Sequence, residues 1–146
     1  MSVQTRRIAG SPSRVWDVLS DGWLYSGWVV GASHIRRVEP EWPQVGAQLH
    51  HSVGSWPAMI SDTTKVLESR PGERLVLQAR GWPLGEARVE LDLVADGDGC
   101  RVTITEVPTN GPGRWVHNPV QDKALDARNR ETLARLADMV EGGAGK

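Results

Sequence analysis

The stretch NPVQDKALDARNRETLARLADMVE, from Asn118 to Glu141, decides the fold of this 146-residue chain. Its apolar residues recur at about 100° per residue, the spacing that places them on one face of a helix. Pro119 suits the first turn, where a backbone N–H has no helical partner in any case. The stretch predicts one long amphipathic helix near 117–141, with a flexible tail at 142–146. The residues of its apolar stripe are Leu125, Thr132, Leu133, Leu136, Met139 and Val140.

A shorter helical segment stands near the N-terminus, after a first strand predicted at 3–9. In GSPSRVWDVLSDG, Ser11 is a suitable N-cap and Pro12 a suitable first helical residue. Gly22 ends this helix. The following WLYSGWVVG leaves room only for a second short helix or turn before Gly27 and Gly31. We therefore expect two short helices directly after the first strand.

The chain between these helices alternates apolar and polar residues, and its separators are rich in Pro, Gly and Asp. In ARVELDLV, for example, Ala87, Val89 and Leu91 share one face of a strand. Short connections favour an antiparallel meander. Its apolar face must be covered, and only the long C-terminal helix is large enough to cover it. The predicted strands are 33–39, 46–54, 58–69, 73–82, 86–94 and 100–107.

These elements predict an α+β fold, in which a curved antiparallel sheet of about seven strands wraps around the C-terminal helix. A single domain would span residues 1–146. Because a strongly curved sheet and a helix do not touch everywhere, we expect a cavity between them. The two short helices would close one end of that cavity.

The overall composition argues against several classes of protein. The net charge of −1 gives no electrostatic footprint for nucleic acid, and Arg6, Arg7, Arg36 and Arg37 fit solvated strand faces better than a basic patch. Cys100 is the only cysteine, which excludes an intrachain disulfide and a thiolate zinc site. The sequence shows neither a signal region nor a membrane span. We expect a cytoplasmic protein without a cofactor or metal.

Two ionisable residues are candidates for chemistry in the cavity. His50 and His51 are neighbours on a strand, so they point to opposite faces and cannot bind one metal together. His51 shares the concave face with Leu49. Glu106 continues the inward face of its strand, and either His51 or Arg80 could pair with it. If His51 and Glu106 meet, they form a candidate acid/base pair; alternatively, Glu106 reaches solvent at the strand end.

Other candidates are polar or aromatic side chains near the expected cavity. Asn129 lies on the helix stripe and would contact either a ligand or the sheet backbone. We expect Trp16 to anchor the core, Trp28 to form a wall that a ligand touches, and Trp23 and Tyr25 to be more exposed. Aromatic residues in turns would form a lid, a dimer face or separate packing contacts; these are Trp56, Trp82 and Trp115. The ligand-binding candidates are Trp28, His51, Trp82, Glu106, Trp115, Leu125 and Asn129.

Four motifs give the chain a resemblance to a known superfamily: SPSRVWDVLSD, GWVVGASHIRRVEP, VGAQLHH and RNRETLARLADMVE. In their order and spacing, residues 3–141 resemble the START/polyketide cyclase-like (SRPBCC) superfamily, and especially its bacterial polyketide cyclase/dehydratase-like branch. The resemblance implies a helix-grip fold with a deep apolar cavity. It does not imply one reaction, because no catalytic motif is shared across the superfamily.

Three functions stay open at this point. The first is the binding or carrying of a small hydrophobic or aromatic molecule by a monomer or homodimer. The second is a cyclase/dehydratase-type enzyme acting on a polyketide-like or other apolar substrate, and the third is a co-chaperone-like protein-interaction module. A hydrogen-bonded pair of inward ionisable residues would favour the enzyme. A lone inward ionisable residue would favour binding, and a filled cavity would favour protein interaction.

Overall fold

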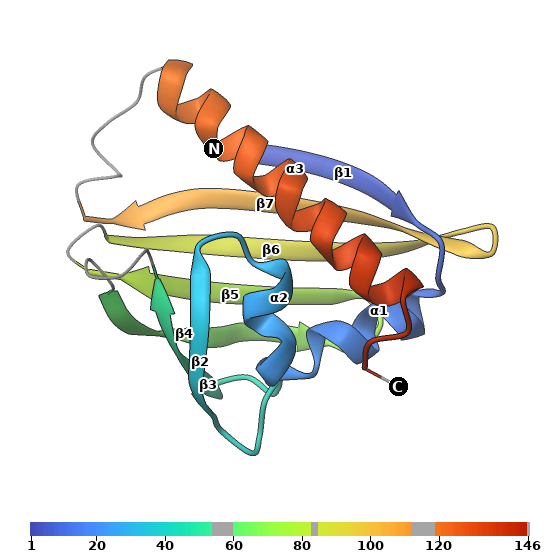
Figure 1. Cartoon of the computed structure of the whole chain (residues 1–146), viewed down its shortest axis with the longest axis horizontal. Helices are drawn as coiled ribbons and strands as arrows, with labels where there is room; N and C mark the ends of the chain where they lie inside the picture. The colour runs from blue at the N-terminus through green and yellow to red at the C-terminus, as the bar shows by residue number, and fades with distance from the viewer. Residues whose placement is uncertain (54–59, 83–84, 112–118, 146) are drawn as a thin grey trace.

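A computed structural model describes residues 1–53, 60–82, 85–111 and 119–145, in which seven strands form one sheet. The strand order is β1-β7-β6-β5-β4-β3-β2, and every neighbouring pair is antiparallel (Figure 1). The predicted meander is thus confirmed, with β1 added beside the last strand. The strands are β1 (Ser2–Ile8), β2 (Ala32–Val38), β3 (Gln48–Val53), β4 (Ile60–Arg70), β5 (Arg74–Gly81), β6 (Gly85–Asp96) and β7 (Gly99–Asn110).

The helices begin and end close to the predicted positions. They are α1 (Pro12–Leu19), a 3₁₀ turn η1 (Gly22–Leu24), α2 (Tyr25–Trp28) and α3 (Pro119–Glu141). The Ser11 hydroxyl accepts a hydrogen bond from the Arg14 N–H at 3.2 Å, which confirms it as the N-cap of α1. Asp21 caps η1 in the same way, by accepting from the Trp23 N–H at 3.1 Å.

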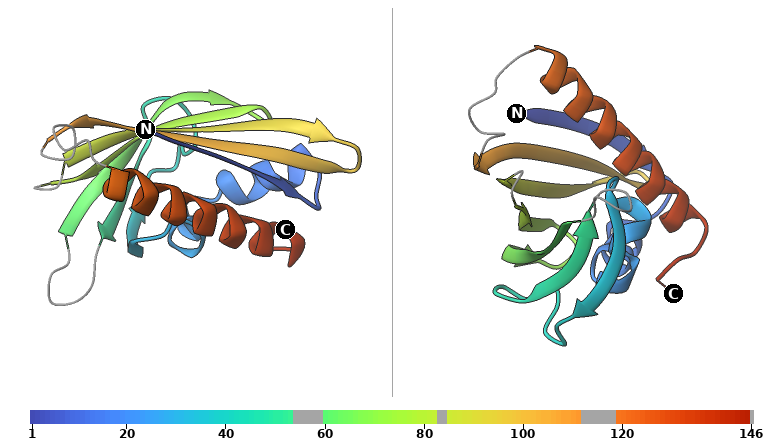
Figure 2. Two further views of the ribbon diagram at one scale, coloured as in Figure 1. Left: turned by 90° about the horizontal axis from the view of Figure 1, so that it is seen from above. Right: turned by 60° about the vertical axis from the view of Figure 1, so that its left-hand side comes forward.

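Helix α3 and the short helices lie on the same face of the curved sheet, as both views in Figure 2 show. Leu133 and Leu136 of α3 are completely buried, and Val15 and Val18 of α1 belong to the same core. Alternation along the strands supplies the other half of this core, because every second residue points toward α3. The predicted packing of α3 against the concave face is confirmed.

Polar contacts fix the N-terminal half and the last turn of α3 to the N-terminal part of the chain. The Ser2 hydroxyl donates to Asp126 at 2.6 Å, and the Ala9 N–H donates to Glu141 at 2.9 Å. Arg14 donates to the carbonyl of Val140 in the last turn of the helix, and also to the carbonyl of Ala144 at 3.0 Å, within the segment expected to be a flexible tail. These contacts hold α3 at a fixed position over β1.

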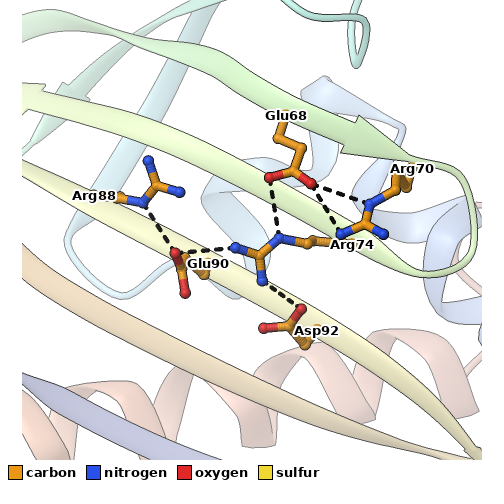
Figure 3. A network of polar contacts seen from close by, with 6 residues as sticks. All are labelled: Glu68, Arg70, Arg74, Arg88, Glu90 and Asp92. Carbon is orange, nitrogen blue, oxygen red and sulfur yellow. Dashed lines mark hydrogen bonds and ion pairs between the residues drawn. The ribbon is translucent and has the colours of Figure 1, made fainter.

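The opposite, convex face of the sheet carries a network of charges (Figure 3). Arg74 forms ion pairs with Glu68, Glu90 and Asp92 at 3.2, 3.1 and 2.7 Å. Val76 lies between Glu68 and Glu90 in the strand register and is fully buried, although it is not part of the main core. The long charged side chains therefore cover an apolar residue on the face opposite the described helices. Arg70 and Arg88 complete the network.

Strands β6 and β7 come unusually close where β6 begins. Gly85 has a φ of +123°, and a Cβ at this position would lie 2.2 Å from the carbonyl oxygen of Asn110. Gly111 also has no room for a side chain, because a Cβ added there would lie 2.5 Å from the Gly85 Cα. Only glycine allows this backbone conformation and this approach.

The four arginines considered in the sequence stand on the two edge strands. Arg6 and Arg7 belong to β1, Arg36 and Arg37 to β2, and all four are exposed. Because β1 and β2 are the two ends of the strand order, the two pairs share neither a strand nor adjacent strands.

Candidate functional site

A cavity of about 330 Å³ lies between α3, the segment around α2, and the concave face of the sheet. Volumes of this size are typical of small-molecule sites. Most of the lining residues are apolar, with a few polar and charged side chains among them. They are Tyr25, Trp28, Val29, Val30, Gly31, Ala32, His51, Leu77, Ala79, Arg80, Gly81, Gly85, Glu86, Ala87, Val89, Ile104, Glu106, Pro108, Asn110, Leu125, Arg128, Asn129 and Thr132.

His51 lines this cavity from β3 and is only 2% exposed. Its Nε2 shares a hydrogen bond of 2.8 Å with the hydroxyl of Thr64, which is itself fully buried behind the cavity wall. The Tyr25 ring stacks on the His51 ring at 6.0 Å, and the Tyr25 hydroxyl lies 3.4 Å from the same Thr64 hydroxyl. Tyr25, Thr64 and His51 thus form one buried polar chain.

Burial favours the neutral forms of both rings in this chain. It lowers the pKa of His51 below its ordinary value, because an imidazolium would lose its hydration. Burial likewise raises the pKa of the Tyr25 phenol. At neutral pH the linked side chains of Tyr25, Thr64 and His51 therefore present an uncharged imidazole and an uncharged phenol to the cavity.

The lowered pKa of His51 predicts acid sensitivity. In the unfolded chain the pKa is about 6.5. As the pH falls from that value toward the folded-state pKa, the unfolded chain binds a proton that the folded protein does not. The free energy of unfolding should therefore decrease over this interval, and His51→Gln should remove that part of the decrease.

Urea denaturation at about pH 7.5 and about pH 5.5, on either side of the ordinary histidine pKa, measures the effect. His34→Gln is the control, because His34 is exposed. Equal losses of stability in the unaltered protein and in His51→Gln would show that His51 does not cause the acid sensitivity.

Glu106 lies on the inward face of β7, as expected, and is 8% exposed. Its carboxylate forms an ion pair with Arg128 of α3. Among the described residues it makes no hydrogen bond with His51, which is hydrogen-bonded to Thr64 instead. Arg80 is 3.8 Å from both Asp62 and Glu86 instead. The structure thus gives Glu106 a partner from the helix, where the sequence suggested one from the sheet.

Trp28 and Asn129 line the cavity from α2 and α3, and each is 2% exposed. Trp28 Nε1 and Asn129 Nδ2 find no hydrogen-bond partner in the described part of the chain. Tyr25 packs its ring edge-on against Trp28, with centroids 5.2 Å apart. His51 Nδ1 is unpaired like the nitrogens of Trp28 and Asn129, so three buried polar atoms of the lining residues have no partner among the described residues.

The aromatic residues of the N-terminal segment differ from the expectation in which of them are exposed and which are buried. Trp23 is 58% exposed, as predicted, but Tyr25 is only 5% exposed, so its predicted exposure is wrong. Tyr25 begins α2 and turns inward to stack on His51, which the short 3₁₀ and helical turns did not reveal. Trp16 is partly buried and packs against the core, whereas Trp28 is the indole of the cavity wall.

The remaining ligand-binding candidates have different positions. Leu125 of α3 lines the cavity. Trp82 does not; it is 40% exposed and donates from its indole N–H to Glu86, which does line it. Trp115 and Trp56 lie outside the described residues. Sequence reasoning missed Arg128 and Tyr25, although Arg128 stands next to Asn129 on the helix.

In the described residues, no group of three or more His, Cys, Asp or Glu side chains is arranged to hold a metal ion. No helix in the same part of the chain is long and apolar enough to cross a membrane.

Comparison with solved structures supports the fold. Protein CV1439 from Chromobacterium violaceum has a TM-score of 0.70 and 20% identity, over 95% of this chain and 96% of its own. The Zhui aromatase/cyclase from Streptomyces sp. R1128 has a TM-score of 0.70 and 15% identity, over 95% and 92%. TTHA0849 from Thermus thermophilus has a TM-score of 0.69 and 14% identity, over 97% of both chains.

Sequence comparison gives the family. No curated protein matches the chain. The family model described as "Polyketide cyclase / dehydrase and lipid transport" matches residues 2–141, nearly the whole length. This match agrees with the curved sheet, the long C-terminal helix and the cavity between them. The chain belongs to the polyketide cyclase/dehydrase and lipid transport family.

Proposed function

We propose that this protein binds and carries a small hydrophobic or aromatic molecule in the cavity between α3 and the sheet. The observation that carries the proposal is the cavity itself, about 330 Å³ and lined mainly by apolar side chains. Binding is favourable when an apolar ligand displaces water from apolar surface. The family description, which includes lipid transport, supports the same function.

The open volume also weighs against the third function, the protein-interaction module. A protein that used this scaffold only to bind a partner would gain stability by filling its interior, since interiors are normally close-packed. Here Ala79 and Ala87, which have small side chains, and Gly85, which has none, line the space without filling it.

An enzyme of the cyclase/dehydratase type is the second candidate, and two observations favour it. His51 is a buried imidazole in the cavity wall, and burial keeps it in the neutral form that a general base requires by lowering its pKa. Glu106 and Arg128 also form a hydrogen-bonded pair of ionisable side chains in the lining. Against the enzyme, the partner of Glu106 is an arginine, which stays protonated and cannot exchange a proton with it, and Glu106 does not orient His51. We therefore favour binding over catalysis.

Filling the cavity tests the proposal. Ala87→Trp places an indole among the lining residues, because Ala87 lies on the inward face of β6. We expect this variant to bind the neutral dye Nile red at least about tenfold more weakly than the unaltered protein, since a single well-placed side chain is often worth that much binding free energy. Fluorescence titration measures the affinity, and circular dichroism checks the fold.

Val94→Trp is the matched control, because Val94 is on the same strand and 62% exposed. It should bind the dye normally. If Ala87→Trp does not fold, Ala87→Leu gives a smaller change in the same direction. Unchanged dye affinity in the folded Ala87 variant would place the dye elsewhere and contradict the proposal. Native mass spectrometry of the purified protein then separates the two candidates. If the mass of a retained molecule is unchanged after incubation with the protein, the protein is a carrier. If the mass changes, the protein is an enzyme.

A further inference from the structure

An ion pair joins the helix to the sheet beside the cavity. Arg128 of α3 pairs with Glu106 of β7, and both residues line the cavity. The Glu106 side chain is only 11% exposed, whereas the Arg128 side chain is 41% exposed. One end of the pair is therefore in the interior, and the other end is in contact with water. The pair thus lies where the cavity meets solvent, and it spans the opening between the helix and the sheet.

The helix backbone is held in place on both sides of Arg128. Two residues before it, Asp126 accepts a hydrogen bond from the Ser2 hydroxyl of β1 at 2.6 Å. From Asn129 onward, α3 contributes the residues that are buried against the sheet and the short helices. Arg128 itself is exposed. Separation of the ion pair therefore requires only a movement of the Arg128 side chain, while the helix keeps its position.

Such a pair separates readily. Because one partner is in contact with water, dissolved ions screen the attraction between the two charges. Ion pairs with an exposed partner contribute little to stability, and an arginine side chain gains rotamer freedom when it is released. The Glu106 carboxylate is not sealed from solvent, so water replaces Arg128 when the pair opens. A closed and an open arrangement are therefore both populated.

We propose that the ion pair of Arg128 and Glu106 is a gate at the mouth of the cavity, and that the Arg128 side chain swings away each time a small molecule enters or leaves. This inference rests on the proposed function, and it adds a control of the rate of exchange. In a gated cavity, the fraction of protein with an open gate sets both the association rate and the dissociation rate. Salt weakens the ion pair and therefore speeds exchange.

Stopped-flow fluorescence with Nile red measures both rates. The dye is neutral, so salt does not act on a charge of the dye. The comparison is made at about 0.01 M and about 1 M NaCl, between which the screening length falls from about 30 Å to about 3 Å. We expect the association and dissociation rates of the unaltered protein to rise together by about two- to fivefold, the factor that corresponds to an ordinary ion pair with an exposed partner.

Arg128→Gln removes the gate. At low salt both rates should be about two- to fivefold higher than in the unaltered protein, and their dependence on salt should disappear. A residue that served only as part of the wall would change mainly the dissociation rate. Arg135→Gln is the matched control, because Arg135 pairs with Glu131 at 3.2 Å on the exposed side of the same helix, and neither residue lines the cavity. It should leave both rates unchanged.

Glu106→Gln opens the same gate from the sheet and replaces Arg128→Gln if that variant does not fold. If neither variant folds, the unaltered protein decides, because rates that do not rise with salt contradict the gate. An unchanged association rate in a folded variant contradicts it as well and leaves the proposed function standing. So does an equal rise in Arg135→Gln, since the net charge of α3 would then be responsible. Absence of Nile red binding to the unaltered protein contradicts the proposed function itself.

Discussion

Replacing Leu136 by alanine should lower the free energy of unfolding by about 2–5 kcal/mol, the range measured for large-to-small changes in well-packed cores. Leu136 is completely inaccessible to solvent and belongs to the core between α3, α1 and the concave sheet. The loss combines the transfer free energy of the removed atoms with the cost of the space left behind. Urea denaturation followed by circular dichroism measures it.

Val120→Ala, on the same helix, is the control. Val120 is 76% exposed, so the change should alter the free energy of unfolding by no more than about 0.5 kcal/mol. A loss below about 0.5 kcal/mol for Leu136→Ala would mean that α3 does not pack through this face, and the predicted stripe would then be wrong.

Gly85→Ala should be comparably destabilising, by about 3–5 kcal/mol, for a different reason. The backbone φ of +123° is unfavourable for any residue with a Cβ, which costs about 1–3 kcal/mol by itself. In addition, the new Cβ would lie 2.2 Å from the Asn110 carbonyl oxygen, so β6 and β7 must separate. A contact with backbone cannot be relieved by a change of rotamer.

Gly46→Ala isolates the second contribution. Gly46 has a similar φ of +91°, but a Cβ there would meet nothing within 4 Å. It should therefore cost only the backbone strain, about 1–3 kcal/mol. Thermal denaturation of both variants gives the difference. Equal losses would show that the strands separate at no cost. Because Gly85 and Asn110 both line the cavity, Gly85→Ala should also weaken ligand binding.

Sequence periodicity was sufficient for the side chains that come from long regular elements. His51, Glu106 and Asn129 all line the cavity, because alternation in a strand and the 3.6-residue repeat of a helix fix which face a residue occupies. Leu133 and Leu136 were assigned to the core for the same reason, and both are buried. The face of a residue follows from local geometry alone.

Sequence periodicity does not predict which side chains of two different elements contact each other. Glu106 has an inward direction set by β7, but its partner Arg128 depends on how far α3 is displaced along the sheet. A weak signal was present, because Arg128 is three residues after Leu125 and four before Thr132, which places it beside the stripe. Tyr25 escaped prediction because η1 and α2 are too short for a periodic pattern to give a direction.

The arginines on β1 and β2 have a consequence for aggregation. An open sheet ends in two strands whose outer N–H and C=O groups are free to pair with another chain, and such edges are templates for fibrils. Here Arg6 and Arg7 stand on one edge, and Arg36 and Arg37 on the other. Arg7 is paired with Asp96 and Asp98, so the repulsion that we expect to oppose an edge-to-edge approach comes mainly from the other three guanidinium groups. We therefore expect the two edges of this open sheet to resist pairing with another copy, as charged residues on edge strands generally do.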